Sequence, residues 1–322
     1  MKNTVLPALA AMLLAGAATT CAAAQPQFRV GTYNIRTSSA DNATTNAWKY
    51  RRGDLAGLVR KLDLDIVGFQ EVQPGQLDFL RKQLAKYALA GLPLDKDGKR
   101  IQGNAVFFRA DRFDLLGEGA FWLSETPEVP YSKSWKTAYA RVCNWATLKD
   151  KASGATLCFA NVHTDHVSGL AREKGMELVL GRLEEIAPKG ASVILVGDHN
   201  CRETSKPAKL VAARMRDALH ASQTPPKGPW RTFTGWRWVE AEIPATEALK
   251  VDAAVRNATK GTPEGDRIED GVPVFLKYGA RIDYIYVSEG VKVLAYEVHP
   301  DTRPDGRHYP SDHFPVTAVI EI

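Results

Sequence analysis

The sequence predicts an α/β protein, of the α+β kind, in which mixed β-sheets are flanked by helices. Helical and strand patterns alternate along the chain: "YRRGDLAGLVRKLDLDIVGFQEV" predicts a helix followed by a buried strand, and a helical pattern over 168–187 precedes a strand over 192–197. Other strands are joined as hairpins, most clearly 139–148 and 155–163 around the turn-rich "KDKASG". Hairpins exclude a purely parallel sheet, so a mixed sheet or a pair of sheets with outer helices is expected.

The remaining elements of the first half follow from local apolar patterns. "FRVGTYNIR" predicts the first strand, which ends in polar residues. Residues 74–86 predict a second helix, because three leucines share one face. "GNAVFFRADRFDLLGEGAFWLS" predicts two strands around a charged turn at 110–112.

The second half continues the same alternation. The helix over 168–187 is amphipathic, with apolar side chains on one face and charges opposite. Residues 222–280 are rich in Pro, Gly and charge, and predict a loop with a short helix near 245–256. "RIDYIYVS", "VKVLAYEVHP" and "FPVTAVIEI" predict the closing strands.

The first 24 residues predict a secretory signal peptide. "MKNTVLPALAAMLLAGAATTCAAAQ" has a positive start at Lys2, a short apolar run and a small-residue cleavage site, so we expect cleavage after Ala24. No segment reaches the roughly 20 apolar residues of a transmembrane helix. We therefore expect an exported protein, periplasmic or secreted, without a transmembrane segment. Lipid attachment at Cys21 is less favoured, because the residues one and three positions before it do not suit such a signal.

The mature chain, residues 25–322, is expected to be a single domain and a monomer. Loss of the signal removes only Lys2 from the charges, leaving 41 Lys and Arg against 37 Asp and Glu, a net charge of +4. This mild basic balance suits an anionic substrate but lacks the concentrated charge of a dedicated nucleic-acid binder. Cys143 and Cys158 lie on neighbouring predicted strands, where either a disulfide or two buried thiols is compatible with the sequence.

Polar residues stand at the ends of several predicted strands. They are Asn34, Glu71, His163, Asp198, Asn200, Asp283, Asp312 and His313. Each alone is explained by a turn, a cap or a hydrogen-bonded structural role. Together they supply oxygen ligands for a hard divalent cation and two histidines for proton transfer. Zinc-type cysteine spacing and the G-x-S-x-G of an α/β-hydrolase are both absent from the sequence.

Four motifs in a specific order and separation carry a family resemblance: "GFQEV", "VGDHN", "RIDYIYVS" and "YPSDHFPV". Over about residues 28–322 the chain resembles the endonuclease/exonuclease/phosphatase superfamily, the deoxyribonuclease I-like metal-dependent phosphoesterases, and looks like a secreted bacterial member. The resemblance implies a four-layer sandwich of two mixed β-sheets flanked by helices. It also implies a phosphate-ester substrate and Mg²⁺ or Mn²⁺ as the cofactor.

The resemblance assigns a metal-binding role to Asn34, Glu71 and Asp312. It also implies that His313 handles a proton while Asp283 orients the imidazole ring. A metal beside Glu71 neutralises charge that develops on the phosphate during attack.

Further catalytic roles are implied at the ends of two other strands. His163 and Asn200 match donors to the phosphoryl oxygens, and Asp198 matches the group that orients or deprotonates the attacking water. Arg141 matches an arginine that faces the site, where it could clamp phosphate or form a surface ion pair. His166 is expected to support substrate binding or to cap its loop.

Two departures from the family pattern matter. His199 replaces an aromatic residue in "GDHN" and is expected to pack, because alternation along a strand points it away from Asp198 and Asn200. The segment 222–280 is long for its place in the family, and we expect an insertion near the mouth of the site that influences substrate choice.

The expected activity is metal-dependent hydrolysis of a phosphate mono- or diester by in-line attack of an activated water, on a small molecule or a nucleic acid. A secreted nuclease is the leading alternative, because tryptophans and arginines in "PWRTFTGWRWVE" could line a nucleic-acid groove, although packing is their favoured role. A sphingomyelinase-type enzyme is less favoured, because 222–280 shows no obvious apolar hairpin. A non-catalytic binding protein is disfavoured, because every matched position is intact.

Overall fold

The computed structural model describes residues 25–93, 97, 103–237, 244–246, 268–269, 272–273 and 280–322. The predicted signal peptide, Trp238 and most of 222–280, including nearly all of the predicted helix near 245–256, lie outside these residues. The elements are β1 (Gln27–Asn34), α1 (Trp48–Leu62), β2 (Ile66–Val72), α2 (Pro74–Gln83), β3 (Tyr87–Ala90), β4 (Gly103–Arg109), β5 (Phe113–Trp122), β6 (Val142–Asp150), β7 (Thr156–His163), α3 (Gly169–Ile186), β8 (Ser192–Asp198), α4 (Lys206–Ala212), β9 (Arg216–Asp217), α5 (Ala218–Ala221), β10 (Ile268–Glu269), β11 (Val272–Pro273), β12 (Asp283–Val287), β13 (Lys292–Val298) and β14 (Val316–Glu321).

Two mixed six-stranded sheets form the centre of the molecule. Their strand orders are β13-β14-β1-β2-β4-β3 and β5-β6-β7-β8-β12-β9. In each sheet one central pair is parallel, β1 with β2 and β7 with β8, while the other pairs are antiparallel. The predicted pair of mixed sheets is therefore confirmed.

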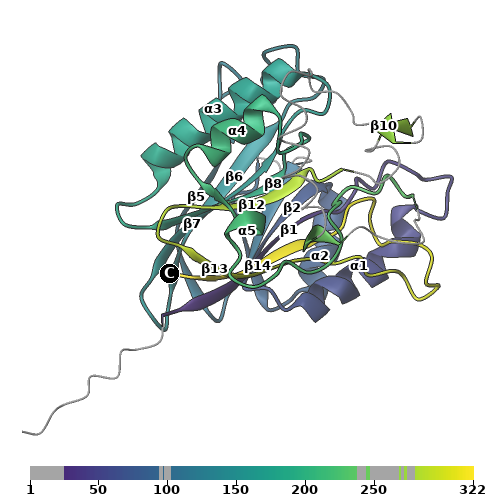
Figure 1. Ribbon diagram of the computed structural model, residues 1–322, viewed down its shortest axis with the longest axis horizontal. Coiled ribbons are helices and arrows are strands. Elements are labelled where there is room, and N and C mark those ends of the chain that lie inside the picture. Colours follow the sequence, from purple (N-terminus) through teal and green to yellow (C-terminus); the bar gives the residue numbers. More distant parts are fainter. Residues whose placement is uncertain are drawn as a thin grey trace, which may run out of the picture.

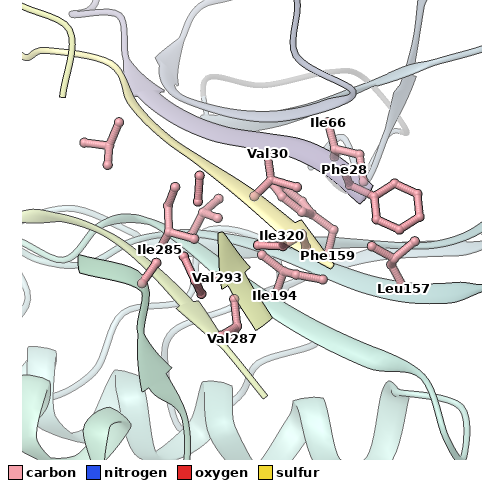
Figure 2. Close-up of a cluster of buried hydrophobic side chains, with 14 of the residues drawn as sticks. Phe28, Val30, Ile66, Leu157, Phe159, Ile194, Ile285, Val287, Val293 and Ile320 are labelled. Carbon is pink, nitrogen blue, oxygen red and sulfur yellow. The ribbon is translucent and has the colours of Figure 1, made fainter. Parts of the chain in front are cut away.

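The sheets face one another across an apolar core. Side chains from both meet there, as Figure 2 shows for Phe28, Val30, Ile66, Leu157, Phe159, Ile194, Ile285, Val287, Val293 and Ile320. All ten are fully buried, which removes their apolar surface from water and holds the sheets together.

Helices cover the outer faces of the two sheets (Figure 1). Helix α3 packs Met176, Val179 and Leu183 onto the sheet that contains β7 and β8, and α4 covers the same face. Helices α1 and α2 pack Leu55 and Leu80 onto the sheet that contains β1 and β2. The order helix, sheet, sheet, helix is the predicted four-layer sandwich.

Most predicted elements are found within a few residues of their expected bounds. Helices expected over 74–86 and 168–187 appear as α2 and α3, and the expected hairpin appears as β6 and β7. The prediction omitted α4, α5, β3, β9, β10 and β11, which are too short to show a clear periodicity. The three cysteines of the described residues are buried free thiols, which answers the open question of a Cys143–Cys158 disulfide. No helix among the described residues is long and apolar enough to cross a membrane.

Candidate active site

Strand register gathers three of the predicted site residues at one end of the second sheet. His163 is the register partner of Asp198 between β7 and β8, and Asp283 is its partner between β8 and β12. Gly197 precedes Asp198 with φ 145°, and a Cβ there would lie 1.9 Å from the Val162 carbonyl oxygen. Because only glycine fits this approach, the residue is required for β8 to bring Asp198 between its two neighbours.

The first sheet contributes Asn34 from β1 and Glu71 from β2. The β2–β4 ladder shifts register between Phe69 and Val72, and Glu71 has a positive φ of 62°. This β-bulge re-aims the glutamate at the strand end. Its Oε1 accepts a hydrogen bond of 3.1 Å from Asn34 Nδ2, and its Oε2 accepts one of 2.9 Å from the Thr37 amide.

Asn34 joins the two sheets at the site. Its Nδ2 also donates to Asp198 Oδ2 at 3.0 Å, so one amide group holds a carboxylate from each sheet. Its Oδ1 accepts a bond of 3.0 Å from the Arg36 amide, and its main-chain oxygen accepts one of 2.7 Å from Ser311 Oγ. In this structure Asn34 therefore positions Glu71 and Asp198 through its nitrogen.

A buried amide network beneath the site links the sheets a second time. Asn161 Nδ2 donates to the carbonyl oxygens of Phe69 at 2.9 Å and Ala105 at 3.2 Å, beside the bulge. Its Oδ1 accepts a bond of 2.6 Å from Gln70 Nε2. Gly68 gives this side chain its space, because a Cβ there would lie 2.7 Å from Asn161 Cγ. The network holds the backbone that precedes Glu71.

His313 is a buried imidazole of the site that carries a positive charge. Its Nδ1 lies 2.9 Å from Asp283 Oδ2, and its Nε2 lies 3.7 Å from Asp198 Oδ2. Burial opposes the imidazolium, but the nearby carboxylates of Asp283 and Asp198 outweigh it and raise the pKa of His313 to about 10. His313 is therefore protonated at neutral pH and can donate from Nε2.

For Asp198 and His163, unlike His313, the effect of burial prevails and favours the neutral form of the side chain. Burial, reinforced by the Asp283 carboxylate, raises the pKa of Asp198. Burial and the Arg141 guanidinium hold the pKa of His163 well below its usual value, so this imidazole is neutral. The two side chains approach at 3.4 Å, from His163 Nε2 to Asp198 Oδ2. A carboxylate with a raised pKa can accept a proton near neutral pH, which suits a general base.

Glu71 and Asp312 offer carboxylate oxygens to a hard cation. Burial raises the pKa of Asp312, whose carboxylate is 3.5 Å from Arg36 Nη1 and 3.4 Å from Ser311 Oγ. Burial also opposes the charge on Glu71, but bonds from Thr37 and Asn34 lower its pKa. A buried carboxylate whose pKa remains raised despite nearby positive charges, next to a second carboxylate, fits a divalent cation. Asp198, Asp283 and His313 also cluster within 4.8 Å, but Asp283 holds the charged His313, so Asp198 is the member of this group that offers a further carboxylate beside the pair.

His199 and Asn200 follow directly after β8, and the structure agrees with the expected side-chain direction for His199 but not for Asn200. The strand ends at Asp198, and Asn200 has φ 45°, so the alternation that we expected to align their side chains does not extend to it. Asn200 Nδ2 instead donates to the Thr164 carbonyl oxygen at 3.1 Å. His199 is buried against the rings of Tyr284 and Tyr286, which confirms its predicted packing role.

Arg141 and His166 lie at the rim of the same site. Arg141 Nη1 is 3.0 Å from His163 Nε2, and Arg141 Nη2 is 3.0 Å from His166 Nδ1. The Arg141 side chain is 14% exposed, and its Nε lies 3.9 Å from Asp165 Oδ1. Of the two alternatives for Arg141, the geometry matches a guanidinium that faces the site.

Three further residues border the site and were missed in the sequence. Arg36 approaches Asp312, Phe233 places its ring 4.9 Å from that of His313, and Tyr139 stacks on His166 with centroids 5.7 Å apart. Each belongs to a loop that tertiary packing brings to the strand ends, so no local pattern could identify it. Trp236, which we expected to pack, lies with its ring 5.5 Å from Arg51 Cζ.

A second group of metal-type side chains lies elsewhere, and Arg281 neutralises it. Glu203, Asp217 and His220 cluster closely, but Arg281 donates to Glu203 at 2.9 Å and to both oxygens of Asp217 at 2.6 and 2.8 Å. These ion pairs of Arg281 with both carboxylates explain the cluster without a metal.

A family model matches the sequence over most of the chain. The model of the Endonuclease/Exonuclease/phosphatase family matches residues 31–313, which include every predicted site residue. The chain belongs to this family. Family members act as hydrolases on phosphate esters, and the family together with the cluster of acidic side chains at this site suggests binding of a divalent metal.

Two solved structures of the family resemble this protein along almost its full length. A mannosyl-6-phosphatase of Bacteroides thetaiotaomicron is 29% identical, with a TM-score of 0.73 and coverage of 92% of this chain and 100% of that one. A family protein of Bacteroides vulgatus is 27% identical, with a TM-score of 0.75 and the same coverage. The likeness supports the same sandwich fold.

A curated relative resembles a smaller part of the chain. The CCR4-Not complex 3'-5'-exoribonuclease subunit Ccr4 of Coccidioides immitis is 28% identical over 137 residues. The match covers 36% of this chain and 18% of that protein, so the relative is much longer than the shared region.

Proposed function

We propose that this protein is an exported divalent-metal-dependent phosphoesterase, and that its substrates are phosphomonoesters of small molecules. One observation carries the proposal: Asp198 lies between neutral His163 and protonated His313, and Asn34 joins it to Glu71. A base, cationic and neutral donors, and a metal-type carboxylate thus meet where two sheets end. Hydrolysis of a phosphate ester needs each of these groups.

In the proposed mechanism each side chain of the site has its own role. Glu71 and Asp312, with Asn34 beside them, would hold Mg²⁺ or Mn²⁺, which neutralises charge on the phosphate. Asp198 orients the attacking water and accepts its proton, while the ester P–O bond on the opposite side of the phosphorus breaks and the leaving alkoxide takes up a proton from solvent. His313 donates from Nε2 to a phosphoryl oxygen, while Asp283 keeps its ring charged and oriented through Nδ1. His163 and Arg141 add donors to the remaining oxygens, and Asn200 joins them through the second hydrogen of its Nδ2 group, since the first is bound to the Thr164 carbonyl oxygen.

The comparison that covers more of the chain supports a small-molecule monoester as the substrate. The full-length likeness at 29% identity is to a phosphatase, whereas the likeness to the exoribonuclease subunit covers 36% of the chain. A nuclease that hydrolyses DNA or RNA is the second candidate, and the Ccr4 likeness is the observation that favours it. Within the described residues the Trp236 ring packs on Arg51. This contact makes Trp236 less suited to stack on the bases of a nucleic acid.

The experiment is a substrate panel with purified mature protein and Mg²⁺ or Mn²⁺. The panel holds p-nitrophenyl phosphate, mannose 6-phosphate, glycerol 2-phosphate, bis-p-nitrophenyl phosphate, plasmid DNA, RNA and sphingomyelin. Release of inorganic phosphate from the monoesters, with loss of activity in Glu71→Gln and His313→Ala, supports the proposal. Faster cleavage of DNA or RNA supports the second candidate. No turnover of any compound, or full activity in both variants, overturns the mechanism. His308→Ala, at an exposed histidine, is the matched control.

Export and domain organisation are part of the same proposal. Expression of the full chain with its first 24 residues, followed by fractionation and N-terminal sequencing, should give a periplasmic or extracellular protein that begins at Gln25. Lipid attachment at Cys21 would instead leave a membrane-bound protein. A single cooperative unfolding transition of residues 25–322 is expected of one domain.

A further inference from the structure

A continuous row of side chains leads from the buried centre of the site to solvent. His163 lies 3.4 Å from Asp198, Arg141 contacts His163 at 3.0 Å, and the same guanidinium contacts His166 at 3.0 Å. The His166 ring then stacks on Tyr139 at an interplanar angle of 21°. The row changes from 6% exposure at His163 to 64% at Tyr139, so its outer end is open to a ligand.

Two loops hold the outer end of this row in place. The Ala138 amide donates to Asp165 Oδ1 at 3.0 Å, and Ser168 Oγ donates to the Trp135 carbonyl oxygen at 2.7 Å. Thr137 Oγ1 donates to the Tyr139 carbonyl oxygen at 2.8 Å. These bonds tie the loop that bears Tyr139 to the loop that bears His166. An aromatic ring that is exposed yet anchored in this way is preorganised for binding.

We propose that Tyr139, supported by His166, is a platform for the organic group of the substrate, and that this group is a sugar ring. The inference rests on the proposed phosphoesterase function. The Arg141 Cζ atom, which the proposed mechanism places beside the phosphate, lies 5.9 Å from the centroid of the Tyr139 ring. The platform therefore meets the part of a substrate nearest the phosphate. In sugar phosphates this part is the sugar ring, whose C–H groups suit the negative face of an aromatic side chain.

The neighbouring polar groups suit the rest of a sugar. Arg141 and His166, which contact one another at 3.0 Å, place nitrogen atoms beside the Tyr139 ring, where hydroxyl groups of a sugar would lie. A nucleobase would occupy a position farther from the phosphate, because a ribose separates the two. The platform is thus a specificity-determining element for the sugar.

The test compares variants on cyclic and acyclic phosphates. Tyr139→Ala should lower kcat/KM for mannose 6-phosphate by about tenfold, mainly through KM, since stacking is lost but the reacting groups remain. Glycerol 2-phosphate, which has no ring, should be hydrolysed as well as by the wild type. Tyr139→Phe keeps the aromatic face and should stay within about twofold of the wild type on both. Tyr50→Ala, at an exposed tyrosine on α1 that contacts Lys49, is the matched control.

The outcomes separate this inference from the proposed function. If the wild type hydrolyses neither phosphate, the proposed function fails. If the wild type is active but Tyr139→Ala affects both substrates equally, or neither, the platform is wrong. A larger loss on 5'-AMP than on ribose 5-phosphate would also overturn the sugar assignment, because it would place the base on Tyr139.

Discussion

His313 and Asp283 are joined by a fully buried hydrogen bond of 2.9 Å between Nδ1 and Oδ2. The two residues come from different parts of the second half of the chain, and the carboxylate is the main reason that the imidazole remains charged despite burial. The bond fixes which ring nitrogen faces Asp283 and leaves Nε2 directed toward Asp198, 3.7 Å from its carboxylate. One pair thus sets both the charge and the direction of the donor.

Asp283→Asn should therefore lower the pKa of His313 and reduce activity by about 10- to 100-fold, since an amide cannot stabilise the imidazolium in the same way. Because the folded pKa of about 10 exceeds the unfolded value of about 6.5, the pair stabilises the fold fully below pH 6.5. This stabilisation is lost as the pH rises through 10. Histidine NMR titration and urea unfolding between pH 6 and pH 10 measure both effects.

The matched control is Asp305→Asn. Asp305 Oδ2 lies 2.8 Å from His308 Nδ1, so the same kind of pair is changed at an exposed position. Activity and the His313 titration should be unaffected there. An unchanged His313 pKa in Asp283→Asn would contradict the proposed role of the buried pair.

Asn161 is predicted to support both the fold and the position of Glu71. Asn161→Leu leaves the Phe69 and Ala105 carbonyl oxygens and the Gln70 amide without this partner, so the free energy of unfolding should fall by about 2–5 kcal/mol. The Mg²⁺ concentration that gives half-maximal activity should rise as the bulge before Glu71 loosens. Urea unfolding and a Mg²⁺ titration measure the two effects.

A surface asparagine provides the comparison for Asn161. Asn42→Ala removes an exposed bond to the Ser39 carbonyl oxygen and should change the unfolding free energy by less than about 0.5 kcal/mol. Equal stability of Asn161→Leu and the wild type would mean that the inter-sheet network contributes nothing.

Much of the architecture was predictable because its patterns are local. The apolar run Val193–Val196 identifies β8, and the polar residues directly after such strands are the ones that converge. Strand ends that belong to two sheets meet only through the register and stacking of those sheets, and a single sequence does not contain that information. Sequence patterns therefore identify the site residues more readily than the contacts between those residues.

Other parts of the site depend on backbone geometry that sequence patterns do not reveal. Asn200 leaves the strand conformation at φ 45°, so the expected alternation with Asp198 ends before it. Asn161 reads as an ordinary position in a strand, although it links both sheets. Arg36 and Tyr139 reach the rim from loops whose course is set by tertiary contacts.

Asp312→Asn is predicted to separate two effects of the buried Asp312 carboxylate: its destabilisation of the metal-free fold and its contribution to metal binding. Burial raises the pKa of Asp312, so without metal the amide variant should be at least as stable as the wild type. Mg²⁺ at 100 times its Kd should stabilise the wild type by about 2.7 kcal/mol, and the variant much less. Thermal unfolding with EDTA or with Mg²⁺ measures the difference. Asp301→Asn, at a surface ion pair with Lys61, should keep the full response. An equal response in Asp312→Asn would remove Asp312 from the metal site.

His199→Phe is predicted to stabilise the protein at mildly acidic pH. Both ring nitrogens of His199 are buried without a hydrogen-bond partner among the residues that the structure describes, and burial, assisted by Arg281, lowers the pKa of His199 to about 3. The unfolded chain binds a proton at His199 below pH 6.5 while the folded chain does not, so wild-type stability falls as the pH drops from 6.5 toward 3. This residue contributes at most about 1.4 kcal/mol per pH unit to that fall. Phenylalanine keeps the contacts with Tyr284 and Tyr286 and cannot titrate. Urea unfolding at pH 8 and pH 5 should show a stability gain for the variant that is larger at pH 5. A gain of equal size at both pH values would show that His199 is not held neutral by the fold.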